Sequence, residues 1–467
     1  MKPHEYLEKI RANEQDPEKM KLKEYVGYAL GSLCYGSIGH MASQYLRPFY
    51  LSLGMDPKRV GNILAGTKVY DSINDPIVAL IIDNGKSKNG RFKPYLAKLV
   101  PLLALLSIFM FVKSPFGGVA ATTAWCVLTY AIWETVNTFS SISFGAIGTV
   151  MSGNTEERTL YTTIGNMGQQ LAGMVPGLIP FARDLTKGFL PESTFFTICA
   201  VIFAGIGVAT GMFTKNLKER ISPPEKQAHF WDSFVTFFQN KYLILLWSST
   251  LSAIIGNAGN AYMFYQYALG STSLQGIQWA LAGAPHFLAV ALAPVLLKRF
   301  RPSRIIIGCN LLNAVCYFVM YGAANAVGYQ STLGIIFIMC FSVIAWVPFG
   351  IGDVARNILQ MNTFDYTALK TGKRAEATSL MVTGMLTKWA GALTELVVAG
   401  SLVYIGFKSG DSVVQTEATK QGMFFMFSIF PAIGSVLTVI PMLFFNLEGD
   451  EFKRRIAALE AEKIARA

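Results

Sequence analysis

Two aspartates and an asparagine interrupt an otherwise apolar segment of the chain. The run VYDSINDP at 69–76 places Asp71 and Asp75 four residues apart, with Asn74 between them. At 3.6 residues per turn, the three side chains project from one face of a helix. A carboxylate near the centre of a bilayer costs at least about 2.5–3.5 kcal/mol, so such a pair must face a polar cavity or a cation. Neighbouring acids can hold a proton or a desolvated Na⁺, and a fixed pairing with Lys or Arg is the structural alternative.

A second polar stripe follows at 130–138. Tyr130, Glu134, Asn137 and Thr138 recur at the spacing of one helix face. A carboxylate accepts hydrogen bonds from two neighbouring hydroxyls, and the ring of Tyr130 or Trp133 can lie against the apolar face of a sugar. Glu134 is therefore a candidate sugar ligand, with an interhelical ion pair as the alternative. For Trp133, contact with lipid or packing is an equal expectation.

Further candidates lie on other apolar runs. Asn166 and Gln170 belong to a third stripe, where amides can contact a solute or hold membrane helices together. Arg356 could recognise an anionic solute or form a local pair with Asp353. Lys388 has Glu395 two turns later on its own face, which allows a local pair there as well.

Twelve helices of membrane-spanning length are predicted to position these residues. Hydrophobic residues make up 52% of the 467-residue chain and charged residues 15%, an apolar surplus beyond the needs of a soluble core. Strands are not expected, because barrel segments are shorter and alternate in polarity. The apolar stretches long enough to cross a hydrocarbon core about 30 Å thick are 26–51, 60–82, 95–113, 119–150, 160–183, 193–214, 242–268, 274–297, 303–325, 331–361, 376–406 and 420–446.

The net charge of the chain is +11, and its basic residues cluster on one side of the predicted membrane, while the opposite loops are sparse in Lys and Arg. By the positive-inside rule this side is cytoplasmic, so both termini lie inside. A nucleic-acid partner is not expected, because no basic and aromatic surface stands apart from this pattern. The basic clusters fall at 19–23, 86–93, 158, 215–220, 298–304, 370–374 and 453–455.

The longest polar interruption divides the spans six and six. Each half carries a short basic connector after its second helix, GKSKNGRFKP at 85–94 and KRFRPSR at 298–304. Such weak internal symmetry is typical of two bundles that rock around a central site. The predicted parts are a cytoplasmic tail at 1–23, a six-helix bundle at 24–214, a cytoplasmic loop at 215–241, a second bundle at 242–446 and a cytoplasmic tail at 447–467.

Four runs and one lysine carry a resemblance to a known family. They are YDSINDP at 70–76, GRFKP at 90–94, TEER at 155–158, DYTALKTGKRAEA at 365–377, and Lys388. With them the chain resembles the glycoside/pentoside/hexuronide:cation symporters of the major facilitator superfamily, the melibiose permease-like transporters. The resemblance implies an all-α membrane protein of the major facilitator fold, with twelve transmembrane helices in two six-helix bundles.

The resemblance also implies roles for particular residues. Asp71, Asn74 and Asp75 match the family's cation site, where the two acids would be the metal ligands if the ion is Na⁺, and Lys388 lies near that site. Glu134 matches the family's sugar-binding acid.

Several positions depart from the family pattern. A sodium-ligand threonine is replaced by Ala131, which leaves Na⁺ and H⁺ both open, because a proton needs only one carboxylate while a hard cation needs several oxygens. A family arginine is replaced near Gly165, and a tryptophan that packs on galactosides aligns with Thr138, which disfavours a galactoside.

Basic cytoplasmic connectors are expected to pair with carboxylates and hold one face shut, or to anchor the chain to anionic lipid. The gating candidates are Asp83, Arg91, Arg374 and Glu376.

The expected function is secondary active symport of a sugar or sugar derivative, including anionic ones, by a monomer in the bacterial inner membrane. No cofactor is expected besides the coupling ion, and partners are the small-molecule solute and membrane lipid. A carrier of a lysolipid-like amphiphile and a non-transporting nutrient receptor are the alternatives. An enzyme lacks support, because no nucleophile and base or metal-spaced ligand set stands out in the sequence.

Overall fold

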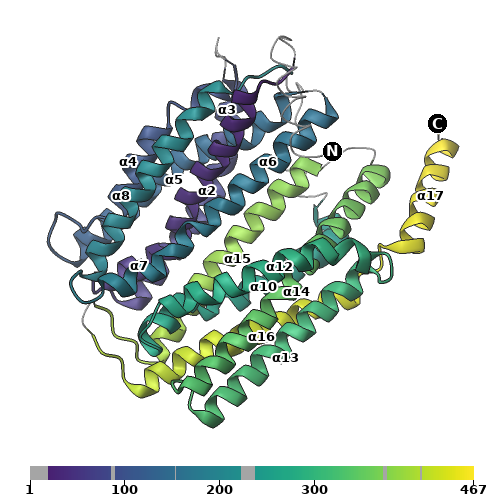
Figure 1. Cartoon of the computed structure of the whole chain (residues 1–467). Coiled ribbons are helices and arrows are strands. Elements are labelled where there is room, and N and C mark those ends of the chain that lie inside the picture. The colour runs from purple at the N-terminus through teal and green to yellow at the C-terminus, as the bar shows by residue number, and fades with distance from the viewer. Residues whose placement is uncertain are drawn as a thin grey trace. The chain divides into compact units, whose positions relative to one another are not determined.

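The computed structural model describes residues 19–85, 90–152, 154–221, 237–371, 376–410 and 413–466. These residues form helices joined by short connections, and no strand occurs among them (Figure 1). Each of the twelve predicted spans coincides with a helix or with an interrupted helical segment. Six helices are long and apolar enough to cross a membrane by length and composition: Glu192–Asn216, Ser273–Leu297, Pro302–Val327, Thr332–Phe364, Val382–Tyr404 and Glu417–Leu443.

The chain forms two compact units, residues 1–226 with 409–413, and residues 227–408 with 414–467. The helices of the first unit are α2 (Leu22–Ser52), α3 (Pro57–Asn84), η2 (Lys93–Tyr95), α4 (Val100–Met110), α5 (Val119–Val150), α6 (Thr155–Met174), η3 (Pro176–Leu178), α7 (Ile179–Thr186), α8 (Glu192–Gly211) and η4 (Met212–Asn216). Those of the second are α10 (Lys241–Gly256), η5 (Asn257–Gly259), α11 (Ala261–Met263), η6 (Phe264–Ala268), α12 (Ser273–Leu297), α13 (Pro302–Val327), α14 (Thr332–Thr371), α15 (Glu376–Tyr404), α16 (Glu417–Leu443) and α17 (Gly449–Arg466).

Small residues allow close helix packing in each unit. In the first unit α2 packs on α6 and α8, and α3 packs on α5. A Cβ at Gly168 of α6 would lie 2.3 Å from the carbonyl oxygen of Ala29 on α2. In the second unit α13 packs on α14 and α16, and a Cβ at Gly434 of α16 would lie 2.6 Å from the Cα of Gly256 on α10. Gly-rich contacts of this kind are typical of membrane helices, where hydrophobicity alone does not drive association.

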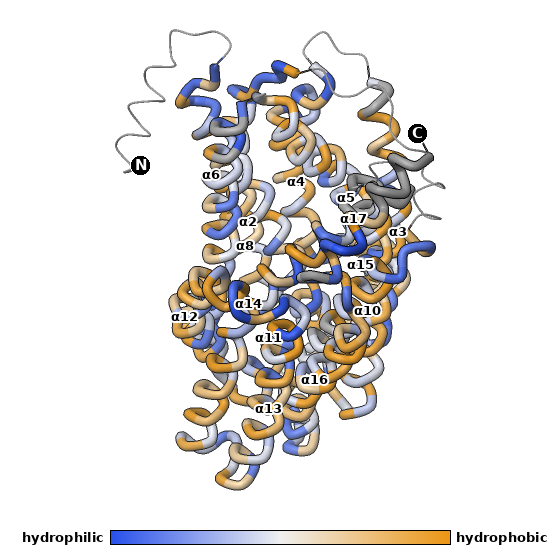
Figure 2. The backbone as a smooth tube through the Cα atoms, turned by 90° about the vertical axis from the view of Figure 1, so that its right-hand side faces the viewer, coloured by the Kyte–Doolittle hydropathy of each residue, from blue (hydrophilic) through white to orange (hydrophobic). Residues whose placement is uncertain are grey.

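Hydrophobic residues line most of the helical length, as the colouring along α13 and α16 shows (Figure 2). Many large apolar side chains remain exposed on these helices, including Leu311, Val315 and Phe318 of α13. An apolar outer surface of this extent fits contact with lipid rather than water.

Two predicted spans are interrupted rather than continuous. The helix predicted at 160–183 ends at Met174 and restarts as α7, because Pro176 and Pro180 lack the N–H that a continuing helix needs. The helix predicted at 242–268 breaks at Asn260, whose φ of +40° is left-handed. The break is followed by the π-helix η6.

Candidate functional site

Polar side chains from α3 and α5 gather where these two helices pack together. Asp71 and Asn74 on α3 are 5% and 7% exposed, and Glu134 and Thr138 on α5 are 6% and 1% exposed. Asp75 is half-buried. Residues spaced i, i+3 and i+4 lie on one face of a helix, so the polar side chains of each helix project to the same side. The packing of the two helices brings the predicted cation residues together with the predicted sugar-binding acid.

The hydroxyl of Thr138 connects the two groups. It accepts a hydrogen bond from Nδ2 of Asn74 over 3.0 Å and lies 3.4 Å from Oδ1 of Asp75. It also lies 3.4 Å from Oε1 of Glu134 on its own helix. A hydroxyl carries one hydrogen, so Thr138 can donate to only one of these carboxylates at a time. The cluster therefore offers carboxylate, amide and hydroxyl oxygens, the ligand types that a hard cation prefers.

One aromatic residue of the predicted solute site, Tyr130, lies close to this cluster. Tyr130 is buried on α5, within electrostatic range of Glu134 and Asp71. Its ring centroid lies 5.8 Å from that of Trp133. The Tyr130 ring therefore lies beside the acids, as a residue that helps to shape a polar site would.

Trp133, which was predicted to contact the solute or to pack, forms a hydrogen bond with a neighbouring helix. It is 3% exposed, and its Nε1 donates a hydrogen bond of 2.8 Å to the hydroxyl of Ser107 on α4. The indole thus joins α4 to α5, and this contact agrees with the packing alternative. Asn137 is half-buried on α5, whereas Asn166 and Gln170 are exposed on α6.

Two of the residues predicted to bind the cation or the solute belong to the second unit. Lys388 is half-buried on α15, and its role toward the acids of α3 stays a prediction. Arg356 on α14 donates from Nη1 to the hydroxyls of Ser249 and Thr250 on α10, over 3.2 and 3.0 Å. Its guanidinium is held by these neutral groups of α10, so it joins two helices of the unit.

The basic connector after α3 is held by an acid that the sequence analysis did not single out. Oε2 of Glu219 accepts a hydrogen bond from the backbone N–H of Arg91 over 2.9 Å. Oε1 accepts from the backbone N–H groups of Phe92 and Lys93, each over 2.8 Å. Of the other gating candidates, Arg374 and the side chains of Asp83 and Glu376 lie outside the described residues. Among these four, Arg91 is the one whose contacts the structure describes.

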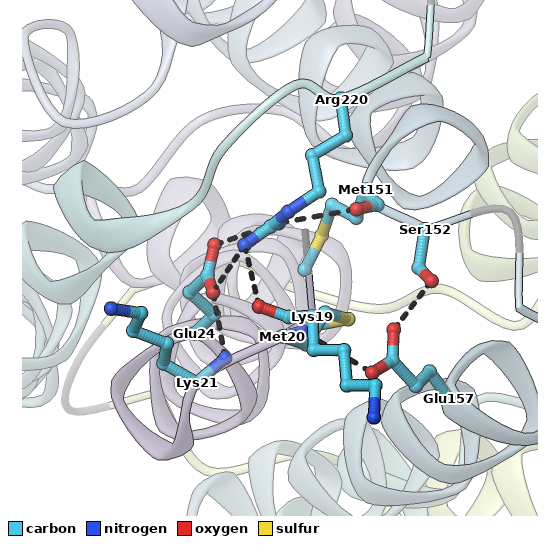
Figure 3. A network of polar contacts seen from close by, with 8 residues as sticks. All are labelled: Lys19, Met20, Lys21, Glu24, Met151, Ser152, Glu157 and Arg220. Carbon is cyan, nitrogen blue, oxygen red and sulfur yellow. Dashed lines mark hydrogen bonds and ion pairs between the residues drawn. The ribbon is translucent and has the colours of Figure 1, made fainter. Parts of the chain in front are cut away.

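A second acid ties the start of α2 to the segment after η4, as Figure 3 shows (Figure 3). Nη1 and Nη2 of Arg220 lie 2.9 and 2.8 Å from the two oxygens of Glu24, which is fully buried. The same guanidinium donates to the carbonyl oxygens of Met151 and Lys19. This bidentate pair is the strong form of an arginine–carboxylate contact.

Glu157 of the TEER run belongs to the same end of the unit. Its carboxylate accepts hydrogen bonds from the Met20 N–H over 3.2 Å and the Ser152 hydroxyl over 2.5 Å. The motif thus has a local structural use in closing α6 against the residues before α2. Its sequence signal was visible, whereas those of Glu24 and Arg220 were indistinguishable from other charges near helix ends.

The second unit repeats the arrangement of Glu219. Glu448, which follows α16, accepts hydrogen bonds from the backbone N–H and the hydroxyl of Ser303, over 2.9 and 2.5 Å. Ser303 is the second residue of α13, directly after the connector that follows α12, and the partners of Glu219 lie in the connector after α3 and at the start of η2. An Asn-Leu pair directly precedes Glu448, and another precedes Glu219 with Lys218 between; Leu217 and Leu447 are both fully buried. In each unit, a carboxylate that follows the sixth helix therefore accepts hydrogen bonds from the chain that comes after the second helix.

Long apolar helices with a buried cluster of acids, amide and hydroxyl define a class, the multi-pass membrane transporters. Within that class, the chain belongs to the MFS/sugar transport protein family, whose model matches residues 27–449. The predicted major facilitator fold is thereby confirmed.

Known proteins similar to the chain agree with this membership. The uncharacterized symporter YjmB of Bacillus subtilis is 26% identical, over 90% of this chain and 91% of that protein. A lactose permease of Leuconostoc lactis is 24% identical, over 95% of this chain and 72% of that protein. The structure of the xylose transporter XylE from E. coli superimposes with a TM-score of 0.59 at 12% identity, covering 92% of this chain and 98% of that one, and at this identity the likeness concerns the fold alone.

Proposed function

We propose that this protein is a cation-coupled symporter of a sugar or sugar derivative that works by alternating access. The observation that carries the proposal is the Thr138 hydroxyl, which lies at 3.4 Å from both Asp75 and Glu134. One shared hydrogen links the acid proposed to bind the cation to the acid proposed to bind the solute. The family and the lactose permease among the relatives support a sugar as the solute class.

Cation binding changes which carboxylate receives this hydrogen bond. A Na⁺ or H⁺ at Asp71 and Asp75 neutralises negative charge there, which weakens Asp75 as an acceptor. Thr138 then donates to Glu134 and holds that carboxylate in one orientation for the hydroxyls of a sugar. A coupling of this kind between two sites is usually worth about 1–3 kcal/mol, or about 5- to 150-fold in affinity.

The remaining parts of the proposal concern the whole transport cycle. Lys388 neutralises the acids of α3 when no cation is bound, so that the empty carrier can reorient without an exposed charge pair. The carboxylates Glu219 and Glu448 keep each basic connector fixed within its own unit during that movement. The protein works as a monomer in the bacterial inner membrane with both termini in the cytoplasm.

Uptake into proteoliposomes tests the proposal. The purified protein is reconstituted, and a panel of labelled solutes is offered under an imposed Na⁺ gradient, an imposed H⁺ gradient or neither. The panel contains neutral mono- and disaccharides, a hexuronate, a sulfonated sugar and a lysolipid. Accumulation of a sugar above its external concentration, dependent on one of the two gradients, is the expected result. The proposal would be contradicted if sugars bind but neither gradient drives their uptake, or if the lysolipid is the one solute of the panel that is transported.

A further inference from the structure

The second unit contains a partly open cavity of about 170 Å³ at the helix break after α10. Its wall is formed by α12, α13, α14 and α16 together with residues of the break. An engineered protein cavity of roughly 150 Å³ takes up a benzene molecule, so this space suits a single six-membered ring. No residue predicted to bind the cation or the solute lines this cavity.

Amide and indole side chains give the wall its chemical character. Gln278, Asn310 and Asn260 contribute amides, and Trp279 and Trp346 contribute indole rings. None of the fourteen described residues that line the cavity carries a charge or a histidine ring. Amides pair with neighbouring hydroxyls as donor and acceptor together, and indoles pack against the apolar face of a ring.

The amide of Gln278 is fixed in one orientation. Gln278 is 5% exposed, and its Oε1 accepts a hydrogen bond of 2.7 Å from the Tyr265 hydroxyl. This bond assigns the carbonyl oxygen to Tyr265 and leaves the NH₂ group, with its two hydrogens, to the cavity; no partner for it occurs among the described residues. A ligand hydroxyl in the cavity can therefore accept a hydrogen bond from this NH₂ group.

Asn310, on another helix of the wall, presents an acceptor. Asn310 on α13 donates from Nδ2 to the carbonyl oxygen of Ile306 one turn earlier, over 2.8 Å. This bond leaves Oδ1 as the group that Asn310 offers to a ligand. One helix of the wall thus donates and another accepts.

Two further amides of the wall are held by hydrogen bonds of their own. Asn313, which is 2% exposed, donates to the carbonyl oxygen of Ala345 on α14 and accepts from the hydroxyl of Ser435 on α16. Asn260 caps α11 with its side-chain oxygen while its backbone is left-handed. Broken helices and π-helical turns recur at the binding sites of transporters.

We propose that this cavity binds one uncharged sugar ring, with Gln278 donating to one hydroxyl, Asn310 accepting from another and Trp279 packing on the ring. A carboxylate or sulfonate is not accommodated, because burial of an anion without a cation is costly. The inference rests on the proposed transport function and adds to it a site for a neutral sugar ring that is made of other residues than the site proposed at Glu134.

Equilibrium binding by the purified full-length protein in detergent, without any gradient, tests the inference. The probes are a labelled neutral methyl pyranoside, together with a uronate and a sulfonated sugar of the same ring size. Gln278→Met and Asn310→Leu should each weaken binding of the pyranoside about 5- to 10-fold, the size expected for one lost hydrogen bond to a neutral group. Gln275→Met is the matched control, since Gln275 is buried on the same helix but does not line the cavity.

The outcomes separate this inference from the proposed function. One outcome is that the wild-type protein binds the pyranoside, both variants bind it more weakly, and no gradient drives flux. This result would overturn the proposed symport and support the cavity assignment. Normal flux with unchanged pyranoside binding in Asn310→Leu and Gln278→Met, or tight binding of the uronate or sulfonate, would overturn the cavity assignment. Should Gln278→Met fail to fold because Tyr265 loses its acceptor, Asn310→Leu and Trp279→Leu decide the outcome alone.

Discussion

Asn74 on α3 donates a hydrogen bond from Nδ2 to the hydroxyl oxygen of Thr138 on α5, across 3.0 Å and 64 residues of sequence. The amide donor occupies an oxygen lone pair, so the hydroxyl hydrogen must point toward another group. Asp75 and Glu134 are the carboxylates within 3.4 Å of it. Thr138 can therefore donate its hydrogen either to Asp75 or to Glu134, but not to both at once.

Removal of this hydroxyl should weaken the coupling between ion and solute. Thr138→Val keeps the side-chain volume but cannot donate, and a hydrogen bond to a charged group is worth about 1.5–3 kcal/mol. The ratio of solute affinities with and without saturating cation should therefore fall roughly 10-fold or more toward one. Thr138→Ser, which retains the hydroxyl, should keep most of the wild-type ratio. An unchanged ratio in Thr138→Val would count against the link, and isothermal titration can measure both variants.

Neutralisation of one acid on α3 should separate transport from folding. Asp75→Asn is nearly isosteric and keeps an oxygen ligand, but it can neither hold a coupling proton nor balance the charge of Na⁺. Gradient-driven accumulation in proteoliposomes should be lost, while the purified protein stays monodisperse. Accumulation at the wild-type level would show that Asp75 does not couple the ion.

Replacement of the buried indole should affect stability more than uptake. Trp133→Phe loses the hydrogen bond to Ser107, a loss of about 1 kcal/mol for a neutral pair. The thermal midpoint in detergent should decrease, and the KM for solute uptake should stay within about twofold. A KM raised about 10-fold, with an unchanged thermal midpoint, would instead assign Trp133 to the solute.

Disruption of the buried ion pair should be costly. Arg220→Ala leaves the fully buried Glu24 carboxylate without its bidentate partner, and removal of one partner from a buried pair costs about 3–5 kcal/mol. The exposed pair of Lys420 and Glu417 provides the comparison, because solvent screens such a pair and Lys420→Ala should lower the thermal midpoint far less. Thermal unfolding of the two variants in one detergent measures the difference, and equal midpoints would refute the structural role of Arg220.

Each connector should loosen separately when its own acid is changed. Glu219→Ala removes the acceptor for three backbone N–H groups, so hydrogen exchange should accelerate at 91–93 and stay unchanged at Ser303. Glu448→Ala should show the opposite pattern. Hydrogen exchange measured by mass spectrometry on both variants checks this. Faster exchange at both 91–93 and Ser303 in either variant would show that Glu219 and Glu448 do not act independently.

The sequence determined the helical segments and the polar stripes on them. Helix positions follow from the local run of apolar residues, and the grouping of Asp71, Asn74 and Asp75 follows from helical periodicity, which is a property of neighbouring residues. The interruptions were visible in part, since Pro176 and Pro180 are local signals. The break at Asn260 has no comparable signal, because Asn adopts the left-handed conformation only where its surroundings favour it.

Tertiary structure alone decided which residues meet. The sharing of Thr138 between two acids, the indole of Trp133 against Ser107, the carboxylate of Glu219 in its connector and the polar cavity of the second unit all join positions distant in the chain. Hydrogen bonds require distances within a few tenths of an ångström, and these depend on how each helix is rotated and translated against its neighbours. Packing of small and large side chains along whole helices sets that rotation, so a local pattern of residues could indicate the chemistry of the site but not its partners.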